Sequence, residues 1–315
     1  GVQQNAASVI LGPTIYSYGV NIGQNYLEEC YLHTGNLQHA CNAILISGQV
    51  YTTPPSSNYV GAAAHEGTTR IVWWTRVGQG GGTGDWLYTY NFGGGWNGPV
   101  VTPLNGGNDF AYVHAAFTSP GSVAMVGQLY FGQYPNGHYG AAVSEFSLGE
   151  VPVLVALEAG EPGVEMLSSA DLWIDPASGS QHVVARDDQG GTRYYFKPSD
   201  AMWEQHSLPL HTFPTTFRAR FLRAEGGDLW LARGDTNGGL EMLRVPEADP
   251  KLAIAWESAE AVVVEPPSPG FAPPSAIYVE SASYQTTPVT ELNLAYCGEY
   301  MAADNEIWWA TLDGV

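Results

Sequence analysis

The chain has 315 residues, including 38 Gly, 18 Tyr and 10 Trp, and only 13% of its residues are charged. Soluble domains carry about 25% charged residues, so this composition excludes helical bundles and coiled coils. The formal net charge of −20 argues against nucleic acid as a partner, because neutralising phosphates requires Lys and Arg. No apolar run reaches the roughly 18 residues that a membrane-spanning helix needs.

Short runs rich in Val, Tyr, Trp, Phe and Thr alternate with Gly-rich turns along the chain, which indicates an all-β fold. One order of elements recurs: an apolar strand, a turn, a second strand ending in a polar residue, a Gly-rich loop, an aromatic third strand and a short fourth strand. The first repeat is the weakest match. The second strands are predicted, in chain order, at Glu28–His33, Arg70–Arg76, Met125–Phe131, His182–Arg186, Leu229–Arg233 and Leu292–Cys297.

The outer strands of each repeat follow from the same pattern. A Trp stands near the start of the fourth strand at Trp96, Trp203 and Trp256. Third strands are predicted at Asp85–Tyr90, Thr192–Phe196, Leu240–Arg244 and Glu306–Thr311, and fourth strands at Pro99–Pro103 and Ala261–Glu265.

The second strands recur about every 53 residues, which is typical of a four-stranded propeller blade. We therefore predict one β-propeller domain of six blades, while the irregular region Tyr16–Cys41 leaves five or seven open. A pair of β-sandwiches or another all-β fold is the alternative. Because the chain ends in a third strand, Ala7–Leu11 is predicted to be the fourth strand of the last blade, so that both termini close the ring. The predicted blades span about 13–55, 56–106, 107–160, 161–213, 214–268, and 269–315 together with 1–12.

The chain has three cysteines, Cys30, Cys41 and Cys297. Cys30 and Cys41 flank a predicted hairpin at Gly35–Asn36, where they either form a disulfide or stay reduced. The chain begins at Gly1 without a basic-then-apolar leader. We expect a secreted or periplasmic monomer whose signal peptide is not part of this sequence.

Three of the nine arginines fall at one repeated position, the end of a second strand: Arg76, Arg186 and Arg233. A guanidinium fork suits a carboxylate or sulfate, so these residues are candidates for binding an anionic substrate. The alternative is a structural role in which the arginines pair with acidic residues of the neighbouring loops, namely Asp85, Asp187, Asp188 and Asp235.

Histidine, tyrosine and glutamate supply the candidate acid–base groups at the same end of the predicted propeller. His138 and Tyr139 lie in the loop of the third blade, and His114 lies on an innermost strand. Glu280 holds the position equivalent to His114 three blades away. These residues suit proton transfer, although a hydrogen-bonded core pair explains His114 and Glu280 equally well. Further candidates for substrate binding are His33, Tyr134 and Tyr300, the tyrosines as stacking surfaces for sugar rings.

The sequence gives little indication of a cofactor. It contains no zinc motif, phosphate loop or dinucleotide fingerprint. Asp187-Asp188-Gln-Gly and Asp235-Thr-Asn237-Gly-Gly resemble fragments of calcium loops, so a structural Ca²⁺ is the one metal considered, with turn formation as the simpler interpretation.

Two blade phrases resemble the sialidase-like, BNR-type propellers: Val184-Ala-Arg-Asp-Asp-Gln-Gly-Gly-Thr-Arg-Tyr-Tyr-Phe196 and Leu231-Ala-Arg-Gly-Asp-Thr-Asn-Gly-Gly239. That superfamily includes propeller polysaccharide lyases such as the ulvan lyases. The resemblance implies that an arginine neutralises a uronate carboxylate while His and Tyr transfer protons. The His-Asn pair that the family carries on an inner strand is absent from this sequence.

We therefore predict a carbohydrate-active propeller that cleaves an acidic, uronic-acid-containing polysaccharide by β-elimination or hydrolysis. The loops differ from blade to blade, which favours one composite site over a small site repeated in every blade. The alternatives are a glycan-binding lectin or adhesion module without chemistry, and a scaffold for protein interactions.

Overall fold

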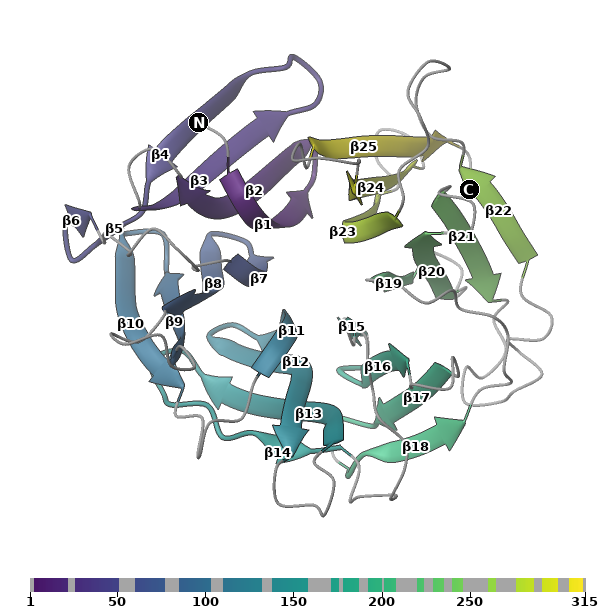
Figure 1. Cartoon of the computed structure of the whole chain (residues 1–315). Helices are drawn as coiled ribbons and strands as arrows, with labels where there is room; N and C mark the ends of the chain where they lie inside the picture. The colour runs from purple at the N-terminus through teal and green to yellow at the C-terminus, as the bar shows by residue number, and fades with distance from the viewer. Residues whose placement is uncertain are drawn as a thin grey trace. The chain divides into compact units, whose positions relative to one another are not determined.

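The computed structural model describes residues 3–21, 26–50, 60–76, 85–102, 110–131, 138–157, 171–175, 178–186, 192–199, 201–207, 220–223, 229–234, 240–245, 260–264, 276–285, 291–299 and 306–313. Over these residues the chain is all-β, as predicted, and forms six sheets (Figure 1). The chain divides into two compact units, residues 1–161 and 162–315.

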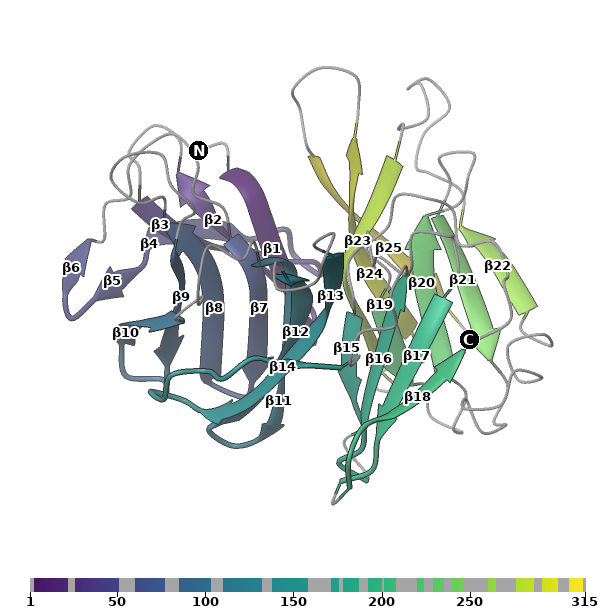
Figure 2. The same cartoon turned by 60° about the horizontal axis from the view of Figure 1, so that its bottom comes forward.

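Unit 1 holds three sheets (Figure 2). The first has the order β1-β2-β3-β4, with β1 (Gln3–Leu11), β2 (Thr14–Asn21), β3 (Tyr26–His33) and β4 (His39–Ala43). The second has the order β6-β5-β10-β9-β8-β7, with β5 (Leu45–Ile46), β6 (Gln49–Val50), β7 (Val60–Glu66), β8 (Thr69–Arg76), β9 (Asp85–Asn91) and β10 (Trp96–Thr102). The third has the order β11-β12-β13-β14, with β11 (Phe110–Ser119), β12 (Ser122–Phe131), β13 (His138–Ser147) and β14 (Val155–Ala156).

Unit 2 also holds three sheets among its described residues. The fourth sheet consists of β15 (Asp171–Ile174), β16 (Gln181–Arg186), β17 (Thr192–Lys197) and β18 (Glu204–Ser207) in that order. The fifth consists of β19 (Arg220–Arg223), β20 (Leu229–Gly234), β21 (Leu240–Val245) and β22 (Glu260–Val264). The sixth shows three strands, β23 (Ala276–Gln285), β24 (Glu291–Glu299) and β25 (Glu306–Asp313).

One edge strand of each sheet packs against an edge strand of a neighbouring sheet in the same unit. In unit 1, β7 contacts both β1 and β11, and in unit 2, β19 contacts both β15 and β23. We call these six the inner strands. These contacts place the inner-strand edges of the three sheets of each unit side by side.

The second sheet is buried on both faces, which explains why the sequence is so poor in charge. Neighbouring side chains of a strand point to opposite faces, yet Trp73 and Trp74 are both fully buried. Trp73 belongs to a core shared with Met125 and Phe146 of the third sheet. Trp74 belongs to a core shared with Tyr18 of the first sheet. A sheet covered on both sides leaves few strand positions where a charged side chain reaches water.

The prediction for the N-terminal strand is wrong. Ala7–Leu11 was expected to complete the last sheet, but it belongs to β1, the inner strand of the first sheet, and pairs antiparallel with β2. The two-residue turn between Leu11 and Thr14 forms this local hairpin, with Gly12 at φ 55°. A hairpin closed over so few residues costs little chain entropy, whereas pairing with the far end of the chain costs much more.

The same correction makes the repeat more regular. Because the first sheet begins at β1, its second strand is β2, and Glu28–His33 falls in the third strand, β3. The second strands then end at Asn21, Arg76, Phe131 and Arg186, each 55 residues after the last. The other five predicted second strands and all four predicted third strands are confirmed by their strand pairing.

Cys30 and Cys41 form a disulfide with an S–S distance of 2.08 Å. They are direct partners in the antiparallel register of β3 and β4. Of the two alternatives that the sequence left open, the structure therefore has the bridge, which links the two outer strands of the first sheet.

Gly61 is a position where the core leaves no room for a side chain. A Cβ there would lie 2.6 Å from a ring carbon of Trp86, which is itself 2% exposed. We expect Gly61→Ala to lower the free energy of unfolding by about 1 to 3 kcal/mol, because the buried ring must shift. Denaturant titration would measure this. The control is Gly94→Ala, since a Cβ on exposed Gly94 would meet no atom within 4 Å; equal stability of the two variants would contradict the packing argument.

Candidate functional site

The inner strands of unit 1 share an irregularity at the same place along their length. The register of β7 shifts at Gly61, between Val60 and Ala62, and that of β11 shifts between Ala111 and His114. The register of β1 shifts between Gln4 and Ala7. Such bulges redirect side chains and often border functional sites. A Cβ on Gly61 would lie 3.7 Å from the Cβ of Val113, so the bulges of β7 and β11 lie side by side.

The longest inner strand of unit 2, β23, also contains a β-bulge. In β23, Val279 pairs with Tyr296 and Ser281 pairs with Ala295, so Glu280 is the extra residue of a bulge. The sequence placed Glu280 and His114 at equivalent positions, and both lie at bulges of inner strands. His114 follows its bulge directly and is only 3% exposed.

The three repeated arginines lie where the sequence predicted, at the ends of second strands. Arg76 ends β8, Arg186 ends β16, and Arg233 is followed by the last residue of β20. In each of these sheets the inner strand runs antiparallel to the second strand, so the arginine lies at the end where the inner strand begins. In the second sheet, which carries Arg76, this is also the end at which β7 has its bulge.

The cross-strand partners of the arginines differ in charge. Asp85 pairs with Arg76, and Glu241 pairs with Arg233. Two of the three arginines therefore lie opposite an acidic residue in the strand register. The residue opposite Arg186 in the strand register is the neutral Thr192.

The predicted acid–base residues of the third sheet lie at the corresponding position. His138 and Tyr139 are the first two residues of β13 and pair with Phe131 and Tyr130 at the end of β12. Tyr134 and Tyr300 lie outside the described residues, as do the calcium-like segments 187–188 and 235–237.

His33 does not share this position. It was expected at the end of a second strand, but β3 is the third strand of its sheet, so His33 lies at the opposite end from the connection between β2 and β3. Its Nδ1 accepts a hydrogen bond from the backbone N–H of Gly35 at 3.2 Å, within the turn to β4. The error follows from the misassigned N-terminal hairpin.

A polar cluster that the sequence did not predict lies between the first and second sheets. The Tyr18 hydroxyl donates to Glu29 Oε2 at 2.9 Å and also contacts His65 Nε2. Arg70 donates from one guanidinium nitrogen to both carboxylate oxygens of Glu29 at 2.7 Å. The Arg70 guanidinium lies 5.3 Å from the centre of the Tyr16 ring. Four strands of two sheets are therefore joined by one set of polar contacts.

Hydrogen-bond donors fix the tautomer of His65 in this cluster. The single proton of the Tyr18 hydroxyl goes to Glu29, so His65 must donate Nε2–H to the Tyr18 oxygen. The other nitrogen, Nδ1, is then a bare lone pair, and it is buried without a partner among the described residues. Protonating Nδ1 would place an unpaired N–H in the interior.

The electrostatics of the cluster agree with this assignment. Burial, together with the nearby Arg70 charge, lowers the pKa of His65 to about 3. Burial and the adjacent Glu29 carboxylate raise the pKa of Tyr18 well above its ordinary value. Both groups are therefore neutral near pH 7. The contacts of Tyr18 with His65 and of Glu29 with Arg70 join the two sheets.

Unit 2 contains a second chain of polar contacts, at the turn between β15 and β16. Ser178 donates to Asp175 at 2.8 Å and contacts the Ser180 hydroxyl at 2.8 Å. Ser180 contacts His182 Nε2 at 3.1 Å, and His182 Nδ1 contacts the Tyr194 hydroxyl at 2.6 Å. Except for the exposed Ser178, these residues are buried. These polar contacts therefore anchor the turn between β15 and β16 to the interior of the fourth sheet.

Among the described residues, one group of side chains has the composition and spacing to hold a metal ion: Glu28, Cys30 and Cys41. No helix in the described part of the chain is long and apolar enough to cross a membrane.

Comparison with known proteins supports the fold. No family model matches the sequence, and no curated protein matches it either. Solved structures do match over nearly the whole chain. A protein of unknown function from Dyadobacter fermentans has a TM-score of 0.67 at 11% identity, covering 98% of this chain and 94% of its own. The BP39L lectin from Burkholderia pseudomallei has a TM-score of 0.57 at 14% identity, covering 98% and 81%.

A third neighbour is the Trypanosoma rangeli sialidase in complex with 2,3-difluorosialic acid, with a TM-score of 0.61 at 10% identity. The match covers 98% of this chain and 54% of the sialidase chain, so this protein spans about half of that enzyme's length. Identities this low concern the fold alone. The chain is thus an all-β protein of several sheets with propeller-like structural neighbours.

Proposed function

We propose that the six sheets are the blades of a single six-bladed propeller that acts on glycans. Support comes from the 55-residue period of the second strands and from neighbours that match 98% of the chain. The proposed blades follow the sequence-predicted boundaries from about residue 56 onward, with the first blade beginning at β1. The Cys30–Cys41 disulfide suits an oxidising compartment, so secretion is part of the proposal.

The proposed ligand is an acidic glycan, bound at the end of the sheets where the second strands finish. The observation that carries this is the register of Arg186, which occupies the repeated arginine position with a neutral partner, Thr192. An arginine whose strand partner is not acidic can form a bidentate pair with a carboxylate of a ligand. Arg76 and Arg233 have acidic partners and contribute less.

Cleavage of the bound glycan is the second part of the proposal. Neutralising a uronate carboxylate acidifies the neighbouring C–H, and a base then removes that proton while an acid protonates the departing glycosidic oxygen. His138 and Tyr139, at the corresponding position of the third sheet, are proposed for these proton transfers, with His114 as a further candidate. Hydrolysis at the same site would need the same acid but a water molecule as nucleophile.

Glycan binding without cleavage is the alternative, because two lectins are among the structures that the chain resembles. Monomeric behaviour remains a proposal in either case.

The test is a panel of uronic-acid polysaccharides incubated with the protein, with three readouts: ultraviolet absorbance of unsaturated products, new reducing ends, and binding by calorimetry. We expect Arg186→Gln to weaken binding of an acidic glycan at least about tenfold, the loss of one charge-assisted bidentate pair. Arg76→Gln is the matched control and should have a smaller effect.

The readouts separate the alternatives. Absorbance indicates elimination, reducing ends without absorbance indicate hydrolysis, and binding alone indicates a lectin. Absence of binding to every acidic glycan, or equal effects of the two substitutions, would refute the Arg186 site.

A further inference from the structure

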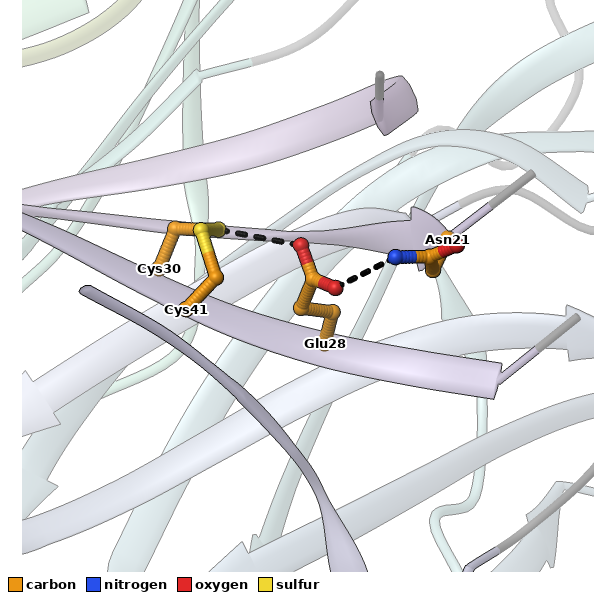
Figure 3. The surroundings of a disulfide bond; sticks show 4 residues. All are labelled: Asn21, Glu28, Cys30 and Cys41. Carbon is orange, nitrogen blue, oxygen red and sulfur yellow. Dashed lines mark hydrogen bonds between the residues drawn. A yellow bond between two sulfur atoms is a disulfide. The ribbon is translucent and has the colours of Figure 1, made fainter. Parts of the chain in front are cut away.

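The disulfide of the first sheet lies beside a buried carboxylate (Figure 3). Glu28 and Cys30 are two residues apart on β3, so their side chains lie on the same face, and Cys41 is the direct partner of Cys30 on β4. Glu28 is only 3% exposed, and its Oε1 lies 3.1 Å from the Cys30 sulfur. One oxygen and two sulfurs therefore meet in one place, all within 4.8 Å of one another.

The carboxylate is held in position by its neighbour. Asn21, the last residue of β2, donates from Nδ2 to Glu28 Oε2 at 2.7 Å, which leaves Oε1 directed at the sulfur pair (Figure 3). The three residues differ in exposure to solvent: Glu28 is buried, whereas Cys41 is exposed. A small solute can thus approach the sulfurs from the Cys41 side.

We propose that reduction of the Cys30–Cys41 disulfide creates a binding site for one soft divalent cation of the Zn²⁺ class, with Glu28, Cys30 and Cys41 as ligands. In the oxidised protein the sulfurs are bonded to each other and are not thiolates, so the site is closed. Thiolates select zinc-like metals, and a carboxylate is an accepted further ligand, with water completing four-coordination.

The chemistry balances with a dithiol as reductant. The S–S bond breaks, the dithiol supplies two electrons and becomes a disulfide, and its two protons pass to the Cys30 and Cys41 sulfurs. Binding of the cation then displaces these two protons to solvent, since the ligands are thiolates. The cation compensates the charge of a carboxylate that is otherwise buried between strands.

The experiment titrates Cd²⁺, as a spectroscopic substitute for Zn²⁺, into protein whose disulfide has been reduced by a phosphine. The phosphine is oxidised to its phosphine oxide, and water supplies the oxygen and the two thiol protons. We expect one Cd²⁺ per chain, with the ultraviolet charge-transfer band of cadmium thiolate. The oxidised protein should show no such band, and because the chain is the same, this comparison does not depend on how a variant folds.

Three variants identify the ligands. Cys297→Ser should bind like the wild type, Cys30→Ser should lose the band, and Glu28→Gln should bind at least about tenfold more weakly because it lacks the anionic ligand. The proposal is overturned if the reduced wild type gives no band, if Cys297→Ser abolishes it, or if Glu28→Gln binds with unchanged affinity.

Discussion

Trp73→Ala is expected to lower the free energy of unfolding by about 3 to 5 kcal/mol, the usual cost of removing a large buried aromatic side chain. Trp73 is fully buried between the second and third sheets. Its ring centre lies 5.0 Å from that of Tyr88 and 5.9 Å from that of Phe146. The substitution therefore leaves a cavity in the contact between two sheets, and denaturant titration would measure the loss.

Two control variants separate the loss of buried packing at Trp73 from the general effect of removing an aromatic side chain. Trp73→Phe should cost less than half as much, because it keeps an aromatic ring and removes an indole N–H that is buried without a partner among the described residues. Phe92→Ala removes a ring that is 54% exposed and should cost about 1 kcal/mol or less. A Trp73→Ala protein as stable as the Phe92→Ala protein would show that the two sheets do not pack through Trp73.

The repeat could be predicted from sequence because its signals are local. The polar residue at the end of each second strand, the Gly-rich loop and the aromatic third strand lie within a few residues of one another, as at Arg186 and Thr192. Antiparallel hairpins with short connections follow directly from such patterns. That is why the arginine position was predicted correctly in three sheets.

The identity of the first strand could not be predicted in the same way. The apolar run Ala7–Leu11 suits an inner strand and an outer strand equally well, since strands at both positions carry apolar residues. Only its pairing with β2 decides the matter. Because Glu28–His33 belongs to the third strand and not to the second, His33 does not lie at the position that the three arginines occupy.

The polar cluster around His65 depends on contacts that no local pattern contains. Tyr18 and His65 are 47 residues apart in sequence, and Arg70 and Glu29 are 41 apart. The one local signal was the pairing of His65 with Arg70 across the hairpin of β7 and β8. Predicting the cluster requires the correct strand order of the first sheet, and the predicted second strand of that sheet is in fact its third.

The stability of the protein is expected to depend on pH through His65. Because burial lowers the pKa of His65 from 6.5 to about 3, the folded protein keeps this side chain neutral where the unfolded chain binds a proton. The favourable contribution is fully present above about pH 6.5 and is lost as the pH falls toward 3. Linkage gives a slope on the order of 1 kcal/mol per pH unit within that window.

His65→Gln isolates this contribution from the carboxylates that also titrate in acid. A glutamine amide can donate to the Tyr18 oxygen as Nε2–H of His65 does, but it cannot take up a proton at pH 4. Denaturant titrations of both proteins between pH 7 and 4 should therefore give curves that converge as the pH falls, because only the wild type loses the His65 contribution. Tyr18, Glu29, Arg70 and Tyr16 surround the histidine in both proteins, so their effects cancel in the difference. Parallel curves would mean that His65 is protonated as readily in the folded protein as in the unfolded chain. That result would contradict the assignment of His65 as a neutral side chain with a single hydrogen bond.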